Sequence, residues 1–296
     1  MSSPVVSVRA ARLDQLASET GQFAILALDH LRSFAVTVRP EAPDSMSSLE
    51  MGQLKEALID GLAHSSTAVL IDPVLATNRL ASGAAQLPVG LILGIEDGDY
   101  EAAAVAPRLL PGWTVERAAN LGADAVKISF YFEADSDTSV AERFVEETVR
   151  QCDIYEMPLF CEPLVRLQGS GDARYKVLDG VKRFGSMGAD VLKIQFPCDT
   201  DSQTSRDEWV DACEAVSALS QSPWALLSEG RDYQQFRELL AVACAAGASG
   251  FLGGRAIWGG AGTDGAMSTY AQRLLELRTI AVRQGTPWQN HRPTTN

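Results

Sequence analysis

The chain has 296 residues, carries a formal net charge of −13, and 46% of its residues are hydrophobic. This apolar content suffices for a full core, and the length suits one domain of the common barrel size of about 250 residues with short additions. The acidic balance and the lack of a Lys/Arg cluster argue against nucleic acid as a partner. We expect residues 1–296 to form a single domain with a peripheral N-terminal segment (1–20) and a peripheral C-terminal tail (285–296).

The cysteine pattern and the apolar runs bear on cellular location. The five cysteines are widely spaced and odd in number, which predicts reduced thiols in a cytoplasmic protein. There is no basic segment followed by an apolar run near the start and no apolar run of about 18 residues, so we expect neither export nor a membrane span. The three histidines show no HxH or HExxH spacing, and we expect no metal and no cofactor.

Short apolar runs alternate with amphipathic segments from one end of the chain to the other. Nearly continuous apolar runs are typical of parallel strands buried on both faces. Their alternation with helices predicts an α/β protein with a closed (β/α)8 TIM barrel. An open doubly wound sheet is the alternative, and it is less favoured because no Gly-rich dinucleotide fingerprint follows any run. The eight predicted strands cover residues 23–30, 67–73, 89–95, 125–132, 158–165, 191–196, 224–230 and 250–257.

The segments between the runs contain helix signals. Residues 114–121 place apolar side chains on one face, Ser205 and Glu208 form an S-x-x-E capping box, and Asp232 is a candidate N-cap. Three similar turns, LGAD (121–124), MGAD (187–190) and AGAS (246–249), each place glycine where a left-handed helix C-cap is expected.

Charged side chains lie inside, or at the C-terminal ends of, runs that otherwise read as core. A lone buried lysine is costly, because burial disfavours its charged form, and one such lysine is readily explained by a structural ion pair. Two lysines and a glutamate on three consecutive strands instead indicate a functional polar site. These charged residues are Asp29, Asp72, Lys127, Glu162, Lys193 and Arg255.

The strand order brings the central three of these residues together. Neighbouring strands lie about 4.8 Å apart, so Lys127, Glu162 and Lys193 should converge at the mouth of the barrel. Asp29 should face the same mouth from the first strand, and Asp72 is a candidate for ordering Lys127. A nearby cation and a dry pocket lower the pKa of a lysine and expose its nucleophilic amine. A glutamate beside it is suited to moving protons.

The last two runs end in glycine-containing segments. Ser228-Glu229-Gly230 ends the seventh run, and Gly253-Gly254-Arg255 lies in the eighth. The loops at these positions form the usual phosphate site of TIM barrels, where backbone N–H groups and an arginine hold the anion. Close packing of glycine against a helix is the alternative explanation of these glycines.

Several segments together resemble one known family. GADAVKISFYFEAD around Lys127, FCEPL around Glu162, RFGSMGADVLKIQFP around Lys193, LLSEG at 226–230 and GFLGGRAIW at 250–258 resemble the class I tagatose 1,6-bisphosphate and sulfofructose 1-phosphate aldolases. The resemblance implies that Lys193 forms the Schiff base, that Lys127 is the second active-site lysine and that Glu162 transfers protons. It places Asp29 near the reacting hydroxyls. The implied phosphate site comprises Ser228, Gly230, Gly254 and Arg255.

One segment departs from this family. Its members follow the first-strand aspartate with Gln and often Arg, whereas Asp29 is followed here by His30 and Leu31. We expect His30 to contact substrate, to become charged near its ordinary pKa of about 6.5, and to leave a charged C6 group less firmly held.

The resemblance implies cleavage of a ketohexose 1-phosphate, 1,6-bisphosphate or 6-sulfo 1-phosphate to dihydroxyacetone phosphate and an aldehyde. A Schiff-base transaldolase, a keto-acid aldolase and a non-catalytic sugar-phosphate sensor remain alternatives. The expected partner is therefore a small sugar phosphate, and assembly into a homo-oligomer is possible.

Overall fold

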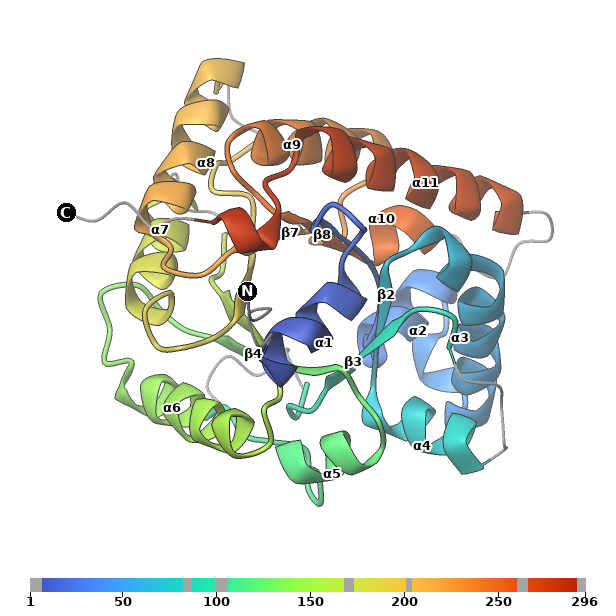
Figure 1. Ribbon diagram of the computed structural model, residues 1–296. Helices are drawn as coiled ribbons and strands as arrows, with labels where there is room; N and C mark the ends of the chain where they lie inside the picture. The colour runs from blue at the N-terminus through green and yellow to red at the C-terminus, as the bar shows by residue number, and fades with distance from the viewer. Residues whose placement is uncertain are drawn as a thin grey trace, which may run out of the picture.

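A computed structural model describes residues 7–81, 87–98, 106–167, 173–200, 204–259 and 266–291. Eight parallel strands pair in chain order, and β8 pairs back onto β1, so the sheet is a closed barrel surrounded by helices (Figure 1). The predicted TIM barrel and all eight predicted strands are therefore confirmed. The strands are β1 (Phe23–Leu28), β2 (Ala68–Ile71), β3 (Gly90–Gly94), β4 (Ala125–Tyr131), β5 (Leu159–Leu164), β6 (Val191–Ile194), β7 (Trp224–Leu227) and β8 (Gly250–Gly253).

The outer layer consists of helices that alternate with these strands. The α-helices are α1 (Val8–Leu16), α2 (Arg32–Val38), α3 (Ser48–Leu62), α4 (Pro73–Ala81), α5 (Val115–Asn120), α6 (Ser139–Ile154), α7 (Ala173–Phe184), α8 (Arg206–Leu219), α9 (Tyr233–Ala245), α10 (Arg255–Trp258) and α11 (Ala266–Gln284). Short 3₁₀ turns are η1 (Pro43–Ser45), η2 (Ala63–Ser65) and η3 (Trp288–Asn290). Within the described part of the chain, no helix is long and apolar enough to cross a membrane.

The interior of the barrel changes from apolar to charged along its axis. Its lower layers are filled by one compact group of buried side chains. Because strand side chains alternate between faces, the residue two positions further along a strand points into the same interior. Lys127, Glu162 and Lys193 each lie two positions beyond a member of that group. The strand members of the group are Phe23, Ile25, Ala27, Ala68, Leu70, Ile92, Ala125, Phe160, Val191, Ala225 and Leu252.

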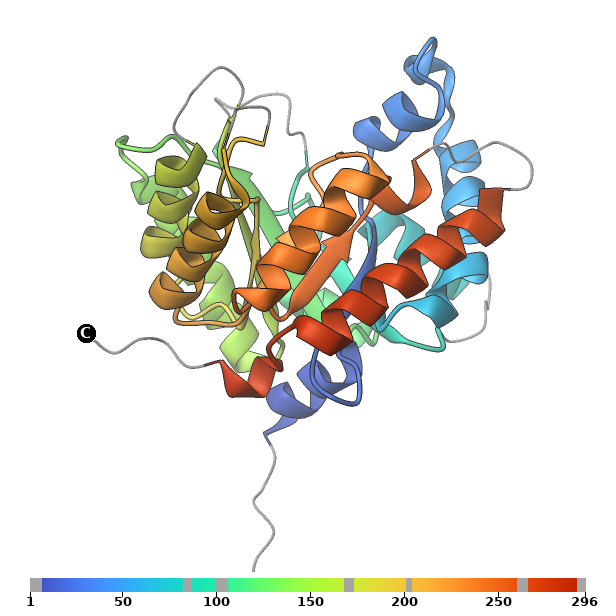
Figure 2. The same cartoon turned by 90° about the horizontal axis from the view of Figure 1, so that it is seen from above.

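The lower end of the barrel is closed by both ends of the chain. Leu13 and Leu16 of α1 are buried against the barrel interior, and Trp288 packs against the same group. The N–H of Trp288 donates to the carbonyl of Gly21. Helix α1 lies across this opening in Figure 1, and Figure 2 shows it at the end opposite α2. The expectation of peripheral terminal segments is wrong for this part, because residues 8–16 and 288 plug the barrel.

The helix signals in the sequence are confirmed, except at one of the three glycine turns. Thr114 caps α5, Ser205 and Glu208 form the complete capping box of α8, and Asp232 caps α9. The glycines of the three similar turns, Gly122, Gly188 and Gly247, all have positive φ. Gly122 and Gly247 directly follow the C-cap residues of α5 and α9, as a left-handed cap requires. Gly188 lies four residues beyond the end of α7, so the prediction that it caps a helix is wrong.

The eighth strand is shorter than predicted. It ends at Gly253, and Arg255 is the first residue of α10 instead of a strand residue. Arg255 therefore leaves the sheet where the chain turns outward. This turn places its side chain at the rim of the barrel, where it lines the cavity described below.

Gly250 lies where β8 pairs with β1 and closes the barrel. Its replacement by alanine tests this contact between the two strands. Gly250 has a φ of 127°, and a Cβ there would lie 1.9 Å from the carbonyl oxygen of Phe23 on β1. We expect Gly250→Ala to lower the free energy of unfolding by at least about 2 kcal/mol, from backbone strain and overlap together. Urea denaturation measures the change.

A matched control for Gly250→Ala lies in α3. A Cβ at Gly52 would meet nothing within 4 Å. Gly52→Ala should therefore raise the free energy of unfolding by about 0.5–1 kcal/mol. Equal effects of the two substitutions would contradict the role assigned to Gly250.

Candidate active site

A cavity of about 230 Å³ opens at the C-terminal ends of the strands. In TIM barrels this end carries the catalytic residues. Most of the charged residues singled out in the sequence line it. The lining residues are Ala27, Asp29, His30, Ser33, Lys127, Tyr131, Glu162, Leu164, Lys193, Gln195, Leu227, Ser228, Glu229, Leu252, Gly254 and Arg255.

Lys127 lies among three carboxylates at the base of this cavity. Its Nζ is 2.9 Å from Oδ2 of Asp29 and 2.9 Å from Oε2 of Glu162, and it also donates to Oε1 of Glu96. The hydroxyl of Ser129 lies 3.0 Å from the same Nζ and donates to Glu96 at 2.7 Å. Lys127 is only 1% exposed, so its charge is compensated by protein groups instead of solvent.

Lys193 shares one carboxylate oxygen with Lys127. Its Nζ lies 2.9 Å from Oε2 of Glu162, the same oxygen that contacts Lys127. Glu162 on β5 pairs in register with Ser129 on β4, two residues beyond Lys127. The contact therefore lies near the C-terminal ends of these strands. Lys193 is 5% exposed and lines the cavity. The predicted convergence of Lys127, Glu162 and Lys193 is therefore confirmed.

Asp29 joins this group directly after β1. Burial raises the pKa of its carboxyl group, but the charges of Lys127, Lys193 and His30 outweigh burial and hold the pKa far below its ordinary value. Asp29 is therefore ionised throughout the physiological range. Its Oδ2 accepts from Lys127, and its Oδ1 is buried without a hydrogen-bonding partner among the described residues.

His30 follows Asp29 and reaches the end of the neighbouring strand β8. Its ring packs edge-on against Trp258, and its Cε1 lies 2.6 Å from where a Cβ of Gly254 would be. Burial lowers the pKa of His30 to about 3, assisted by Arg255 and Lys193 and opposed by Asp29. The expectation that His30 becomes charged near pH 6.5 is wrong, because the buried ring stays neutral there.

Asp72 does not order Lys127 and does not line the cavity. Its Oδ2 accepts from Lys55 of α3 at 2.6 Å, and Lys55 is 1% exposed. Its Oδ1 accepts from the N–H of Leu75 in the first turn of α4. Asp72, which the sequence made a candidate for ordering Lys127 and for contacting substrate, forms a buried structural ion pair and a helix cap instead.

Three of the four residues expected to hold the phosphate, Ser228, Gly254 and Arg255, line the cavity. The N–H of Gly254 donates to the hydroxyl of Ser228 at 3.2 Å, which joins the ends of β7 and β8. The guanidinium of Arg255 packs on Gly230, which has positive φ and no room for a Cβ. The Nε of Arg255 is buried without a partner among the described residues. Burial lowers the pKa of this guanidinium, opposed by Tyr131 and Glu229.

Gly253 departs from the predicted set. It is absent from the cavity lining among the described residues, and a Cβ there would meet Ile257 and Phe251 at 2.7 and 3.1 Å. Gly253 therefore permits close packing beneath the site, which is the alternative explanation considered for these glycines.

The sequence reasoning missed Ser33 and Ser129 and four larger polar residues of the site. Glu96 and Glu229 each follow a predicted strand end or lie at it, where a charged residue is easily assigned to a loop. Tyr131 and Gln195 lie four and two positions beyond Lys127 and Lys193, and the two-residue period of a strand would have found them. All four lie near the lysine pair: Glu96 contacts Lys127, and Tyr131, Gln195 and Glu229 line the cavity.

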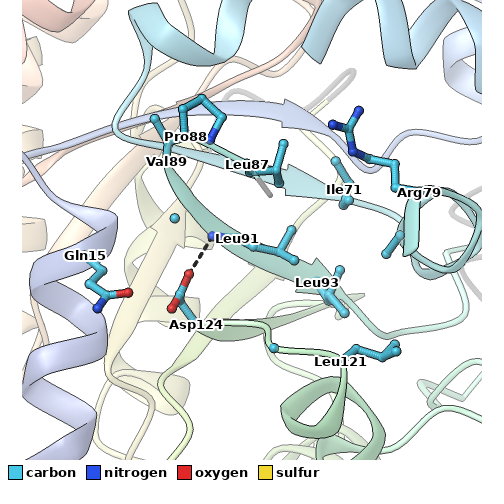
Figure 3. Close-up of a pocket in the computed structure, with 13 residues that line it drawn as sticks. Gln15, Ile71, Arg79, Leu87, Pro88, Val89, Leu91, Leu93, Leu121 and Asp124 are labelled. Carbon is cyan, nitrogen blue, oxygen red and sulfur yellow. Dashed lines mark hydrogen bonds between the residues drawn. The ribbon is translucent and has the colours of Figure 1, made fainter. Parts of the chain in front are cut away.

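A larger cavity, of about 550 Å³, lies outside the barrel (Figure 3). Its wall is mostly apolar, with Leu91 and Leu93 of β3 pointing into it. Its two charged lining residues are engaged, since Arg79 pairs with Glu56 and Asp124 accepts from the N–H of Leu91 at 2.8 Å. It offers no paired lysine and carboxylate, so the chemistry is assigned to the smaller cavity.

A closed (β/α)8 barrel with a buried lysine beside a second lysine and a glutamate at its mouth has the features of an aldolase. A family model of DeoC/LacD aldolases matches residues 24–260, so the chain belongs to the DeoC/LacD family of aldolases and is a lyase. The family resemblance expected from the sequence motifs is thereby confirmed.

Curated relatives and solved structures agree with this assignment. The chain is 28% identical to tagatose 1,6-diphosphate aldolase 1 of Streptococcus pyogenes serotype M1, over 92% of this chain and 94% of that one. It is 26% identical to tagatose 1,6-diphosphate aldolase of Lactococcus lactis subsp. lactis, over 93% and 96%. An archaeal fructose 1,6-bisphosphate aldolase superposes with a TM-score of 0.66 at 16% identity, over 93% of this chain and 99% of that one, which shows a shared fold.

Replacing Asp72 by asparagine separates a structural role from substrate binding. Asparagine keeps the cap of α4 but leaves the buried charge of Lys55 without its partner. We expect Asp72→Asn to lower the free energy of unfolding by about 3–5 kcal/mol while KM stays unchanged. The double variant Lys55→Met/Asp72→Asn should recover part of this loss. A raised KM with unchanged stability would instead assign Asp72 to the substrate.

Among the described residues, no group of three or more His, Cys, Asp or Glu side chains is arranged to hold a metal ion.

Proposed function

We propose that this protein is a class I aldolase that cleaves a ketohexose 1-phosphate, with or without a charged C6 group, through a Schiff base on Lys193. The products are dihydroxyacetone phosphate and an aldehyde. One observation carries the proposal: the Nζ of Lys193 is buried at the cavity wall and shares Oε2 of Glu162 with Lys127. The names of the tagatose 1,6-diphosphate aldolase relatives support a ketose phosphate as substrate.

Glu162 is placed to manage the protons of Schiff-base formation. When Lys193 passes a proton to Oε2 of Glu162 at 2.9 Å, its nitrogen lone pair is free to attack the C2 carbonyl. The resulting carbinolamine loses its hydroxyl as water when Glu162 returns the proton. The product is an iminium ion between Lys193 and C2.

The iminium ion then serves as the electron sink for cleavage. The C4 hydroxyl loses its proton to a carboxylate, the C3–C4 bond breaks, and its electron pair moves to the iminium to form an enamine. The aldehyde leaves, C3 of the enamine is protonated, and water hydrolyses the new iminium. Dihydroxyacetone phosphate and free Lys193 result, so atoms and charges balance without a metal or an organic cofactor.

Asp29 and Glu162 have different roles in this scheme. The strongly lowered pKa of Asp29 makes it a weak base, although its Oδ1, which has no partner among the described residues, is able to accept a hydrogen bond. We assign Asp29 to orienting the hydroxyls of the substrate and Glu162 to the proton transfer at C4. Lys127, fixed by three carboxylates, holds both groups in place.

The C1 phosphate is assigned to the rim formed by β7 and β8. Arg255 supplies a partly buried cation whose Nε has no partner among the described residues, and Ser228 supplies a hydroxyl beside the N–H of Gly254. Gly230 leaves room for the Arg255 side chain. Charged hydrogen bonds of this kind are suited to a phosphate oxygen.

The position of His30 changes what we expect for recognition of the C6 group of the substrate. Its contact with Gly254 places its ring at the phosphate rim, so we assign His30 to the C1 side of the cavity. Leu31 is 41% exposed and brings no charge to this mouth. We therefore propose that substrates with an uncharged C6 end are accepted at least as well as bisphosphates.

Borohydride trapping tests the nucleophile. Reduction with dihydroxyacetone phosphate present should fix a covalent adduct on Lys193, located by peptide mass spectrometry, and Lys193→Ala should lose both adduct and turnover. An adduct on Lys127 would reject the assignment. A coupled assay for dihydroxyacetone phosphate release separates this activity from a transaldolase, a keto-acid aldolase and a sensor, which would not release it.

A comparison of two substrates tests whether the enzyme recognises a charged C6 group. We expect kcat/KM for a ketose 1-phosphate to equal or exceed that for its 1,6-bisphosphate, because Leu31 brings no charge to the mouth of the cavity. His30→Gln should change KM for both substrates together, since His30 lies at the phosphate rim. A strong bisphosphate preference in the wild-type enzyme would show that another residue recognises the C6 group.

A further inference from the structure

A carboxylate lies inside the rim that we assign to the phosphate. Glu229 stands between Ser228 and Gly230 and lines the same cavity as Ser228, Gly254 and Arg255. Its φ of 51° is in the left-handed region, where residues with a Cβ are uncommon. An observed outlier of this kind at a cavity is a reason to ask what the side chain does.

The carboxylate of Glu229 is held by a fixed amide. Gln195 accepts from the N–H of Val165 at 2.7 Å and donates to its carbonyl at 3.1 Å, which determines the orientation of the amide. The other N–H of Gln195 donates to Oε1 of Glu229. Gln195 lies two positions beyond Lys193, so Glu229 is tied to the layer directly above the reactive lysine.

Two arginines offset only part of the cost of burying the Glu229 carboxylate. Arg231 donates to Oε2 at 3.5 Å and also to Thr200, and Arg255 and Tyr131 interact with Glu229 across the cavity. Burial raises the pKa of Glu229, opposed by Gln195, Arg231 and Arg255. A dianion bound beside it would raise this pKa further, because like charges disfavour ionisation.

We propose that Glu229 is a specificity-determining residue of the phosphate rim, whose carboxyl group takes up a proton when a tetrahedral dianion binds. This inference rests on the proposed function, which places a phosphate at the rim. In the bound state the neutral carboxyl keeps the hydrogen bond from Gln195 on Oε1 and offers its proton, on Oε2, to an anion oxygen. The rim thus binds a dianion together with one proton, and it binds the dianion less tightly as the pH rises.

Sulfate is the probe for this coupling, because it remains a dianion at neutral pH and any proton taken up comes to the protein. Titration calorimetry in buffers of different ionisation enthalpy counts the protons. For the wild-type protein we expect uptake of about one proton per sulfate, with affinity falling up to about tenfold per pH unit above the raised pKa of Glu229. In Glu229→Gln, which keeps an acceptor for Gln195, we expect no uptake and an affinity that is independent of pH.

Three further variants make the result decisive. Glu214→Gln removes an exposed charge from α8 and should behave as wild type. Arg255→Met should abolish sulfate binding, and if it does not, the placement of the phosphate rim is wrong while the Lys193 adduct remains a separate test. Uptake that persists in Glu229→Gln overturns the proposal. Uptake that vanishes only in His30→Gln overturns it as well, and assigns the proton to His30.

Discussion

The contact of two ammonium groups with one carboxylate oxygen is the interaction on which the site depends. Oε2 of Glu162 lies 2.9 Å from both Lys127 and Lys193. Neither lysine could be buried at this depth without a nearby negative charge, since an unpaired buried charge is strongly destabilising. Lys127 has Asp29 and Glu96 as additional partners, whereas Lys193 faces the cavity with Glu162 as its hydrogen-bonding partner among the described residues. The unequal sharing leaves Lys127 fixed by three carboxylates and Lys193 held by one of them at the cavity wall.

The barrel makes this arrangement possible through its two-residue period. The same alternation that fills the lower layers with apolar side chains points the next inward residues of β4, β5 and β6 toward one another. The predicted fold and the central lysine and glutamate group followed from this regularity, because it depends on residue type and spacing alone. Glycines at the ends of helices were predictable for the same reason, as at Gly122 and Gly247, since a left-handed cap has few chemical solutions.

The features of the site that the sequence did not predict depend on contacts that residue spacing does not encode. Asp72 pairs with Lys55, a helix residue whose burial was not visible in an amphipathic segment. Glu96 reaches Lys127 from the third strand because the chain continues inward after the strand ends. The neutrality of His30 follows from burial and from the surrounding cations, and both are properties of the assembled cavity. Pairing between distant segments and the electrostatic field at a point require coordinates.

The plug formed by α1 and Trp288 has a consequence for the traffic of small molecules. Leu13 and Leu16 fill the lower opening. The described side chains in the layers above them are apolar, so they offer no hydrogen-bonding groups along which water could pass. In the proposed reaction, the water released by the carbinolamine and the water consumed at product release would therefore pass through the cavity mouth that also admits the sugar. A bound substrate occupies that mouth, so its position would govern when water enters and leaves.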